Sequence, residues 1–183
     1  IFLGFRKFRF YPQYYVAVNQ KVLEQSVDEI NALTSVKFVS ARCRNLFQQS
    51  ALTHIIDTSN PPDYFCKDIA LGLEEGYTVT YAALQIAYYL GFTEIVIIGM
   101  DHRFHYSGEP NESKYLNGPD TNHFDASYFS NANWDNPDLA NSELSYSIAR
   151  ENYEKAGRKI IDATVNGACT VFEKQDYRKV FNL

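Results

Sequence analysis

The chain has few cysteines, no long apolar run and no excess of basic residues, and each of these absences excludes a class of protein. Cys43, Cys66 and Cys169 are far apart and lack C-x-x-C spacing, so the sequence predicts neither a disulfide framework nor a zinc site. Reduced thiols are typical of the cytoplasm, and we expect a cytoplasmic protein. Gln85 and Glu94 interrupt the most apolar stretch, which therefore falls short of the roughly 20 residues of a membrane-spanning helix.

The charge balance and the absence of common nucleotide-binding motifs narrow the choice further. The net charge is -5 and the isoelectric point is about 5.4, whereas general binding to nucleic acid needs a basic surface. We therefore expect no nucleic-acid partner. The sequence contains no G-x-G-x-x-G and no G-x-x-x-x-G-K-[ST], which argues against a dinucleotide-dependent dehydrogenase and against a P-loop enzyme.

Strands and helices are predicted to alternate along the chain. Apolar runs predict strands over 14–18, 37–40, 54–57, 94–98 and 159–163, with a short last strand at Val171 and Phe172. Helical periodicity predicts helices over 19–33, 78–90 and 141–156. This alternation indicates an α/β fold with a mainly parallel sheet, and a length of 183 residues favours one domain over 1–183.

The most informative stretch, GYTVTYAALQIAYYLGFTEIVIIGMD, covers residues 76–101. It predicts a helix followed by a strand that is buried on both faces and ends in Gly99, Met100 and Asp101. Ligands of open α/β sheets bind beyond the carboxyl ends of the strands. We therefore expect Asp101 at a binding site, as a hydrogen-bonding side chain.

A segment of about forty residues without clear periodicity follows, from Met100 to roughly Leu139. Loops longer than about 12–15 residues are usually functional or disordered, and this segment is rich in aromatic residues and holds three of the four histidines. We interpret it as an ordered site loop. His123, with Tyr128 and a carboxylate close by in sequence, is a candidate general base, and a packing or hydrogen-bonding role is the alternative.

Two further groups of residues each allow two interpretations. Gly76, Tyr77 and Thr78 lead into a helix N-terminus, where backbone amides suit a phosphate, or where Thr78 only caps its own helix. Asp101 with the neighbouring histidines, His102 and His105, has side chains that bind zinc or iron, but further ligands are lacking. We predict no metal site.

Three stretches together resemble the sialyltransferase-like superfamily of bacterial surface-glycan proteins, which includes motility accessory factors and hydroxymethylpterin diphosphokinase-like proteins. They are FRFYPQYYVAVN at 8–19, the central stretch at 76–101, and NHFDASYF at 122–129 followed by GRKIIDAT at 157–164. The resemblance implies a Rossmann-like fold, a mainly parallel sheet flanked by helices, that binds a nucleotide-sugar donor. It also implies that no metal or other cofactor is needed.

The resemblance assigns roles to individual residues. Gly76, with Tyr77 and Thr78 next to it, matches the nucleotide phosphate site, and we group Gly99 at the strand end with them. Asp101 matches the aspartate where donor and acceptor meet. The remaining two roles fall in the long loop: His123 would deprotonate the acceptor hydroxyl, and Tyr128 would support the leaving phosphate.

The sequence therefore predicts a glycosyltransferase-like protein that transfers a sugar, a sialic-acid-like sugar being one candidate, from a nucleotide donor to a surface-glycan acceptor. Family members carry a G-N-G-P-S-like turn after their first strand, and this chain has no counterpart, so we expect part of the nucleotide pocket to be missing from 1–183. Two alternatives stay open. One is a Mg²⁺-dependent, pterin diphosphokinase-like enzyme, and the other is a non-catalytic glycan-binding or scaffold module.

Overall fold

The computed structural model describes residues 9–123, 125–127 and 129–183, and it divides into two compact units. Unit 1 consists of residues 1–60 and 105–137, and unit 2 consists of 61–104 and 138–183. Each unit contains a small parallel sheet with helices, so the predicted α/β class is confirmed, while a single Rossmann sheet is not shown. The organisation of 1–183 as one domain stays a prediction.

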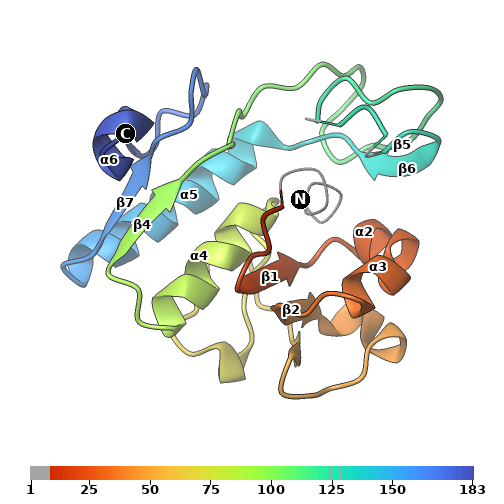
Figure 1. Cartoon of the computed structure of the whole chain (residues 1–183), viewed down its shortest axis with the longest axis horizontal. Helices are drawn as coiled ribbons and strands as arrows, with labels where there is room; N and C mark the ends of the chain where they lie inside the picture. The colour runs from red at the N-terminus through yellow and green to blue at the C-terminus, as the bar shows by residue number, and fades with distance from the viewer. Residues whose placement is uncertain (1–8, 124, 128) are drawn as a thin grey trace. The chain divides into compact units, whose positions relative to one another are not determined.

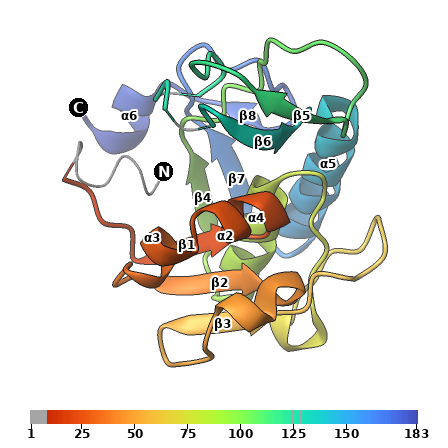
Figure 2. The same cartoon turned by 90° about the vertical axis from the view of Figure 1, so that its right-hand side faces the viewer.

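The first sheet belongs to unit 1 and contains three parallel strands in the order β1-β2-β3 (Figure 2). The strands are β1 (Tyr14–Ala17), β2 (Val36–Ser40) and β3 (Thr53–Ile56). The helices α2 (Gln20–Gln25) and α3 (Val27–Asn31) follow β1, and a 3₁₀ helix over Ala41–Leu46 joins β2 to β3. Their apolar side chains form one core cluster with the sheet, which includes Tyr15, Leu23, Ile30 and Val39.

The single helix predicted over 19–33 is wrong. Asn19 caps α2 as expected, since its side chain accepts a hydrogen bond from the Val22 N–H. Ser26 then leaves the helical region with φ -130° and ψ 26°, and α3 starts at the next residue. The apolar residues keep one face toward the sheet, because Leu23 in α2 and Ile30 in α3 are both fully buried.

A two-stranded antiparallel ribbon in unit 1 lies within the segment that we predicted to lack regular structure. Its strands are β5 (Ser113–Leu116) and β6 (Ala132–Asp135), and Lys114 pairs with Trp134. Lys21 of α2 donates hydrogen bonds to the side chains of Ser113, at 2.7 Å, and Asp135, at 2.5 Å. The ribbon is therefore fastened to α2 by a lysine that is shared between its two strands.

The second sheet belongs to unit 2 and has the order β4-β7-β8, again parallel. Its strands are β4 (Glu94–Ile97), β7 (Lys159–Asp162) and β8 (Glu173–Lys174), so the last strand begins just after the predicted Val171 and Phe172. The helices are α4 (Val79–Tyr89), α5 (Leu139–Lys155) and the C-terminal α6 (Tyr177–Phe181). Figure 1 shows β4 and β7 side by side with α5 behind them.

The burial of β4 differs from the prediction of a strand covered on both faces. Its residues are exposed or half-buried, and Ile98, directly after the strand, is 65% exposed. Among the described residues, β4 pairs only with β7, so it is an edge strand of this sheet. The core of unit 2 is centred instead on aromatic residues of α4, of α5 and of the loop before α4. They include Phe65, Tyr81, Tyr146 and Tyr153.

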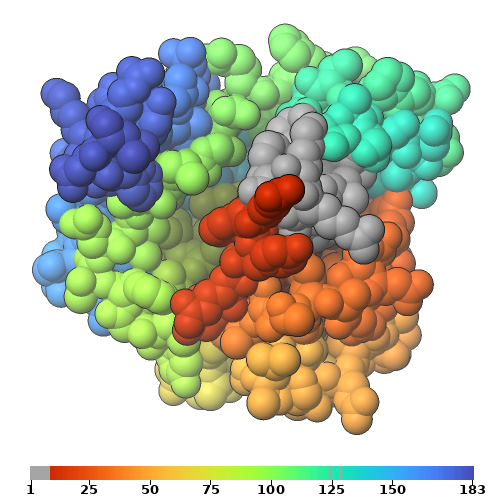
Figure 3. Space-filling view, viewed as in Figure 1, coloured from red at the N-terminus to blue at the C-terminus, as the bar shows by residue number. Residues whose placement is uncertain are grey.

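The C-terminal helix α6 contains no buried residue, and Figure 3 shows its atoms, in dark blue, at the surface. All three cysteines are buried, and burial raises the pKa of the Cys66 and Cys169 thiols, which disfavours their reactive thiolate form. Among the helices described, none has the length and apolar character needed to cross a membrane.

Candidate functional site

The predicted site residues are divided between the two units, and each group is described within its own unit. His123 belongs to unit 1. Unit 2 contains the predicted nucleotide-binding residues and the aspartate at the strand end, namely Gly76, Tyr77, Thr78, Gly99 and Asp101. Tyr128, the predicted support of the leaving phosphate, lies outside the described residues.

His123 is held by a buried carboxylate. The distance from its Nδ1 to Oδ2 of Asp120 is 2.7 Å, and the Asp120 side chain is only 2% exposed. The same carboxylate accepts backbone hydrogen bonds from the N–H of Asn122, at 2.8 Å to Oδ1, and from the N–H of Phe129, at 3.3 Å to Oδ2. Asp120 therefore fixes both the histidine ring and the loop backbone around it.

The histidine is also fixed by packing and by a second backbone clamp. The ring of Phe129 meets the His123 ring edge-on, with a centroid distance of 5.2 Å. One residue earlier, the Asn122 side chain accepts a hydrogen bond from the His105 N–H at 2.7 Å and donates one to the His105 carbonyl at 3.0 Å. The His123 side chain is 26% exposed, so the ring is held in place but reaches the surface.

Asp120 was missed by the sequence analysis, which considered His123 with Tyr128 and the carboxylate inside the stretch 122–129. The sequence did contain a signal for this contact. The pattern Asp120, Thr121, Asn122 is typical of an Asx turn, in which the aspartate side chain accepts a hydrogen bond from the N–H two residues later. Such a turn brings the carboxylate toward the side chain three residues later, which here is His123.

At the start of α4, Thr78 caps its own helix, and a contact of the same turn with a phosphate stays a prediction. The Thr78 side chain accepts a hydrogen bond from the Thr80 N–H at 3.3 Å. Gly76 has φ +63°, and a Cβ added to it would lie 2.3 Å from Cδ1 of Tyr81, so this turn requires glycine. Tyr77 also has a left-handed backbone, with φ +59°, although its ring is bulky and half-exposed.

A buried acid lies next to this turn. Burial raises the pKa of Glu74, while a hydrogen bond from the Gly76 N–H lowers it and the nearby charges of Glu75 and Asp63 raise it. One of the amides that we predicted to face a phosphate therefore already bonds to a carboxyl group of the chain. A phosphate at Gly76 would have to displace Glu74 or find it protonated, because two negative groups at one amide repel each other.

The carboxyl end of β4 is fixed by the loop that follows β7. Gly99 has φ +73°, and the next N–H, of Met100, donates to the Thr164 hydroxyl at 3.1 Å. The carbonyl of Asp101 accepts from the Ala168 N–H at 2.9 Å, and Asp101 is exposed. The predicted position of Asp101 beyond the carboxyl edge of a parallel strand is thus confirmed, and its chemical role stays a prediction.

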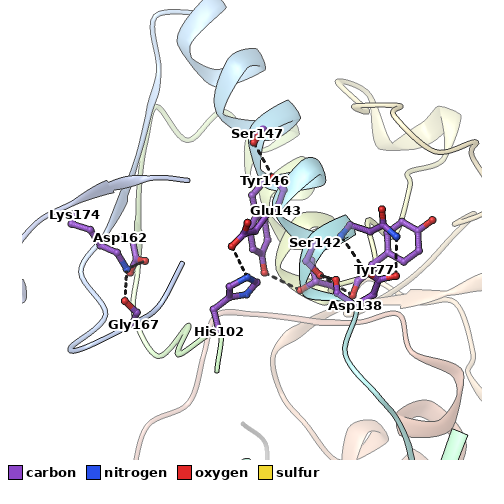
Figure 4. A network of polar contacts seen from close by, with 12 residues as sticks. Tyr77, His102, Asp138, Ser142, Glu143, Tyr146, Ser147, Asp162, Gly167 and Lys174 are labelled. Atoms are coloured by element: carbon purple, nitrogen blue, oxygen red, sulfur yellow. Dashed lines mark hydrogen bonds and ion pairs between the residues drawn. The ribbon is translucent and has the colours of Figure 1, made fainter. Parts of the chain in front are cut away.

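A second histidine forms a polar network within unit 2 (Figure 4). His102 has a left-handed backbone, with φ +52°, and its Nε2 lies 3.1 Å from Oε1 of Glu143 in α5. Its ring packs against Tyr146, whose hydroxyl is 3.2 Å from the Thr78 hydroxyl. These contacts connect the end of β4, the first turns of α5 and the start of α4. Of the four residues His102, Glu143, Tyr146 and Thr78, only Thr78 was among the predicted site residues.

The alternative of a metal site at Asp101, His102 and His105 gains no support. Within the part of the chain that the structure describes, no three or more His, Cys, Asp or Glu side chains form a group that could hold a metal ion. The His102 Nε2 faces Glu143, and the backbone of His105 is clamped by Asn122 in the other unit.

Comparison of the chain with protein-family models, with curated proteins and with solved structures finds no match in any of the three.

Proposed function

We propose that this protein is a cytoplasmic, glycosyltransferase-like enzyme that transfers a sugar from a nucleotide donor to a hydroxyl of a glycan acceptor. The observation that carries the proposal is the pairing of His123 with the buried Asp120 at 2.7 Å. A histidine whose Nδ1 is bound to a carboxylate and whose ring reaches the surface is arranged as a general base. Transfer to a hydroxyl needs such a base, because the attacking oxygen must lose its proton.

A Rossmann-like fold is part of this proposal, and the order of strands in each sheet supports it. The six-stranded Rossmann fold has the order 3-2-1-4-5-6, built from two halves. The sheet of unit 1 has the order of the first half, since β1, β2 and β3 are the first three parallel strands of the chain. The sheet of unit 2, β4-β7-β8, has the order of the second half once the antiparallel ribbon is set aside.

In the proposed reaction, an acceptor oxygen attacks the anomeric carbon of the donor sugar from the face opposite the nucleotide. The new carbon–oxygen bond forms as the bond to the phosphate breaks, the nucleotide leaves with the bonding electrons, and His123 takes the acceptor proton. The configuration of the sugar is inverted. The remaining roles are those inferred from the family resemblance: Asp101 and Tyr128 at the reacting centre, and contacts to the nucleotide from Gly76, Tyr77, Thr78 and Gly99.

Nucleotide binding is tested by thermal denaturation. We expect a cytidine nucleotide at millimolar concentration to raise the melting temperature, because a ligand at a hundredfold its dissociation constant stabilises the native state by about 2.7 kcal/mol. Because Glu74 competes for the amide of Gly76, the shift should be larger near pH 5 than near pH 8. Unchanged melting curves with all common nucleotides at both pH values would contradict the proposal.

The base is tested by a matched pair of histidine variants. His123→Ala should lower turnover of the sugar donor by about 10²–10⁴-fold and leave nucleotide binding unchanged. His102→Ala is the control, because His102 follows Asp101 directly and its Nε2 faces Glu143 rather than Asp120. If His102→Ala abolishes turnover and His123→Ala does not, the proposed base is wrong.

Chelation distinguishes the proposal from pyrophosphoryl transfer to a pterin. We expect donor turnover to survive EDTA. Complete loss that Mg²⁺ restores would indicate the diphosphokinase-like reaction, which neutralises phosphate charge with metal ions.

A further inference from the structure

We infer that Asp120 is the positioning residue of this site: it holds neutral His123 in the Nδ1–H tautomer and so makes Nε2 the basic nitrogen. The tautomer of the His123 ring does not depend on which reaction the protein catalyses. The expected effect of Asp120 on turnover rests on the proposed function.

The tautomer follows from the chemistry of the two atoms in contact. An ionised carboxylate has only acceptors, so a contact of 2.7 Å between Oδ2 of Asp120 and Nδ1 of His123 needs a proton on Nδ1. In a neutral imidazole, one nitrogen carries the proton and the other carries the lone pair. The pairing therefore leaves the lone pair on Nε2, the nitrogen farther from the backbone.

The carboxylate itself cannot turn away, because its oxygens are engaged from several sides. Oδ1 accepts from the Asn122 N–H at 2.8 Å, and Oδ2 accepts from the Phe129 N–H at 3.3 Å besides His123. The Asp120 N–H donates to the Ala126 carbonyl at 2.8 Å, which closes the loop around the side chain. With its side chain 2% exposed, Asp120 has almost no contact with water, so these donors are its partners.

These contacts predict what Asp120→Asn would do. The amide of asparagine has one oxygen and one NH₂ group, so only one of the two carboxylate positions keeps an acceptor. Oxygen at the Oδ1 position preserves the 2.8 Å bond from Asn122 and loses only the longer contact from Phe129. In this orientation, the NH₂ group faces His123 and donates to Nδ1, so the proton of the ring moves to Nε2.

The opposite orientation is less favourable. It would place the NH₂ group against the Asn122 N–H at 2.8 Å, and two donors at that distance leave both without an acceptor. Asp120→Asn should therefore reverse the tautomer of His123 while it preserves the shape of the side chain. After this exchange, the lone pair of the neutral ring lies on Nδ1 and is engaged by the amide of residue 120.

The experiment is nitrogen-15 NMR of the histidine rings in the full chain, without any ligand, at alkaline pH. In the wild-type protein, we expect Nδ1 of His123 to show the shift of a protonated ring nitrogen and Nε2 that of an unprotonated one. In Asp120→Asn, the two shifts should exchange. Asp125→Asn is the matched control, because Asp125 lies in the same loop and accepts from Ser127, and it should leave the ring unchanged.

The wild-type spectrum is decisive even if Asp120→Asn fails to fold. A protonated Nε2 and an unprotonated Nδ1 in the neutral wild-type ring would overturn the inference, and so would an unchanged ring in a folded Asp120→Asn variant. In donor turnover, Asp120→Asn should lose about 10²-fold or more, and the double variant with His123→Ala should be no slower than His123→Ala alone. Absence of turnover in every form, with the expected tautomers, would contradict the proposed function and leave the positioning role of Asp120 standing.

Discussion

Gln85 offers a quantitative test of how unit 2 is held together. This glutamine lies in the middle of α4 and is fully buried, and all of its polar atoms are used. Its Nε2 donates to the carbonyls of Glu74, at 2.7 Å, and Tyr81, at 3.2 Å. Its Oε1 accepts from the N–H groups of Cys66, at 3.0 Å, and Glu74, at 3.4 Å. One side chain thus ties two points of the preceding loop to the helix.

We predict that Gln85→Leu lowers the free energy of unfolding by about 2–6 kcal/mol. Leucine fills a similar volume, but it leaves the Cys66 N–H and the Glu74 carbonyl buried without partners, and each such group costs about 1–3 kcal/mol. The Tyr81 carbonyl contributes little to this sum, because it lies within α4 and already accepts the helical bond of residue 85.

The measurement is urea denaturation followed by far-UV circular dichroism, to which α4 and α5, the two longest helices described, contribute most. The control is Gln48→Leu, the same change at an exposed position, which should alter the free energy of unfolding by no more than about 0.5 kcal/mol. If Gln85→Leu is also within 0.5 kcal/mol of the wild type, the hydrogen bonds of Gln85 do not fasten the loop, and our reasoning about unit 2 is refuted.

Three further predictions concern the turn before α4. Gly76→Ala should lower the melting temperature more than Gly91→Ala, because a Cβ at Gly76 would lie 2.3 Å from Tyr81 whereas nothing lies within 4 Å of one at Gly91. Tyr77 has a left-handed backbone, which glycine adopts without steric cost, so Tyr77→Gly should raise the free energy of unfolding by about 0.5–1 kcal/mol in urea denaturation. A lower free energy of unfolding would show that packing of the tyrosine ring outweighs its backbone strain. Burial raises the pKa of Glu74 in the folded protein, so as the pH rises the Glu74 carboxyl group loses its proton at a lower pH in the unfolded chain than in the folded protein. The free energy of unfolding therefore falls as the pH rises above the pKa of the unfolded chain. Glu74→Gln should therefore stabilise the protein at pH 7 and have little effect at pH 4, and equal effects at both would contradict the cause that we assign.

The sequence predicted those elements whose local signals agree with each other. The helix α4 has apolar residues at helical spacing, a threonine cap at Thr78 and Gly91 just after its end, and the structure places it within one residue of the prediction. The helix predicted over 19–33 failed because its apolar spacing continues across the break at Ser26. The spacing of apolar residues alone cannot reveal a break between two helices when both helices bury the same face.

The ribbon and the partner of His123 were less accessible to sequence reasoning. The sequence SKYL of β5 does not alternate between apolar and polar residues, and ANWD of β6 alternates over only four residues, so neither gives a clear strand signal. The ribbon is held by the pairing of its two strands and by Lys21. The pairing of Asp120 with His123 depends on how the loop closes on itself, although the Asx pattern was visible. His102 was considered only in a metal site with Asp101 and His105, and its contact with Glu143 joins residues that are 41 positions apart in the sequence.

The division of the chain has a consequence for the order of folding during synthesis. Each unit is assembled from two separate segments, so neither corresponds to a continuous stretch of sequence. When β4 leaves the ribosome, its partner β7 has not yet been made, and residues 105–137 and α5 must emerge first. Pairing over such a separation is slow, because the entropy of closing the loop is lost before the contact forms. Among the strands described, β4 therefore waits longest for its partner, and it is partly apolar while it is unpaired. A chaperone would matter most during this interval of synthesis.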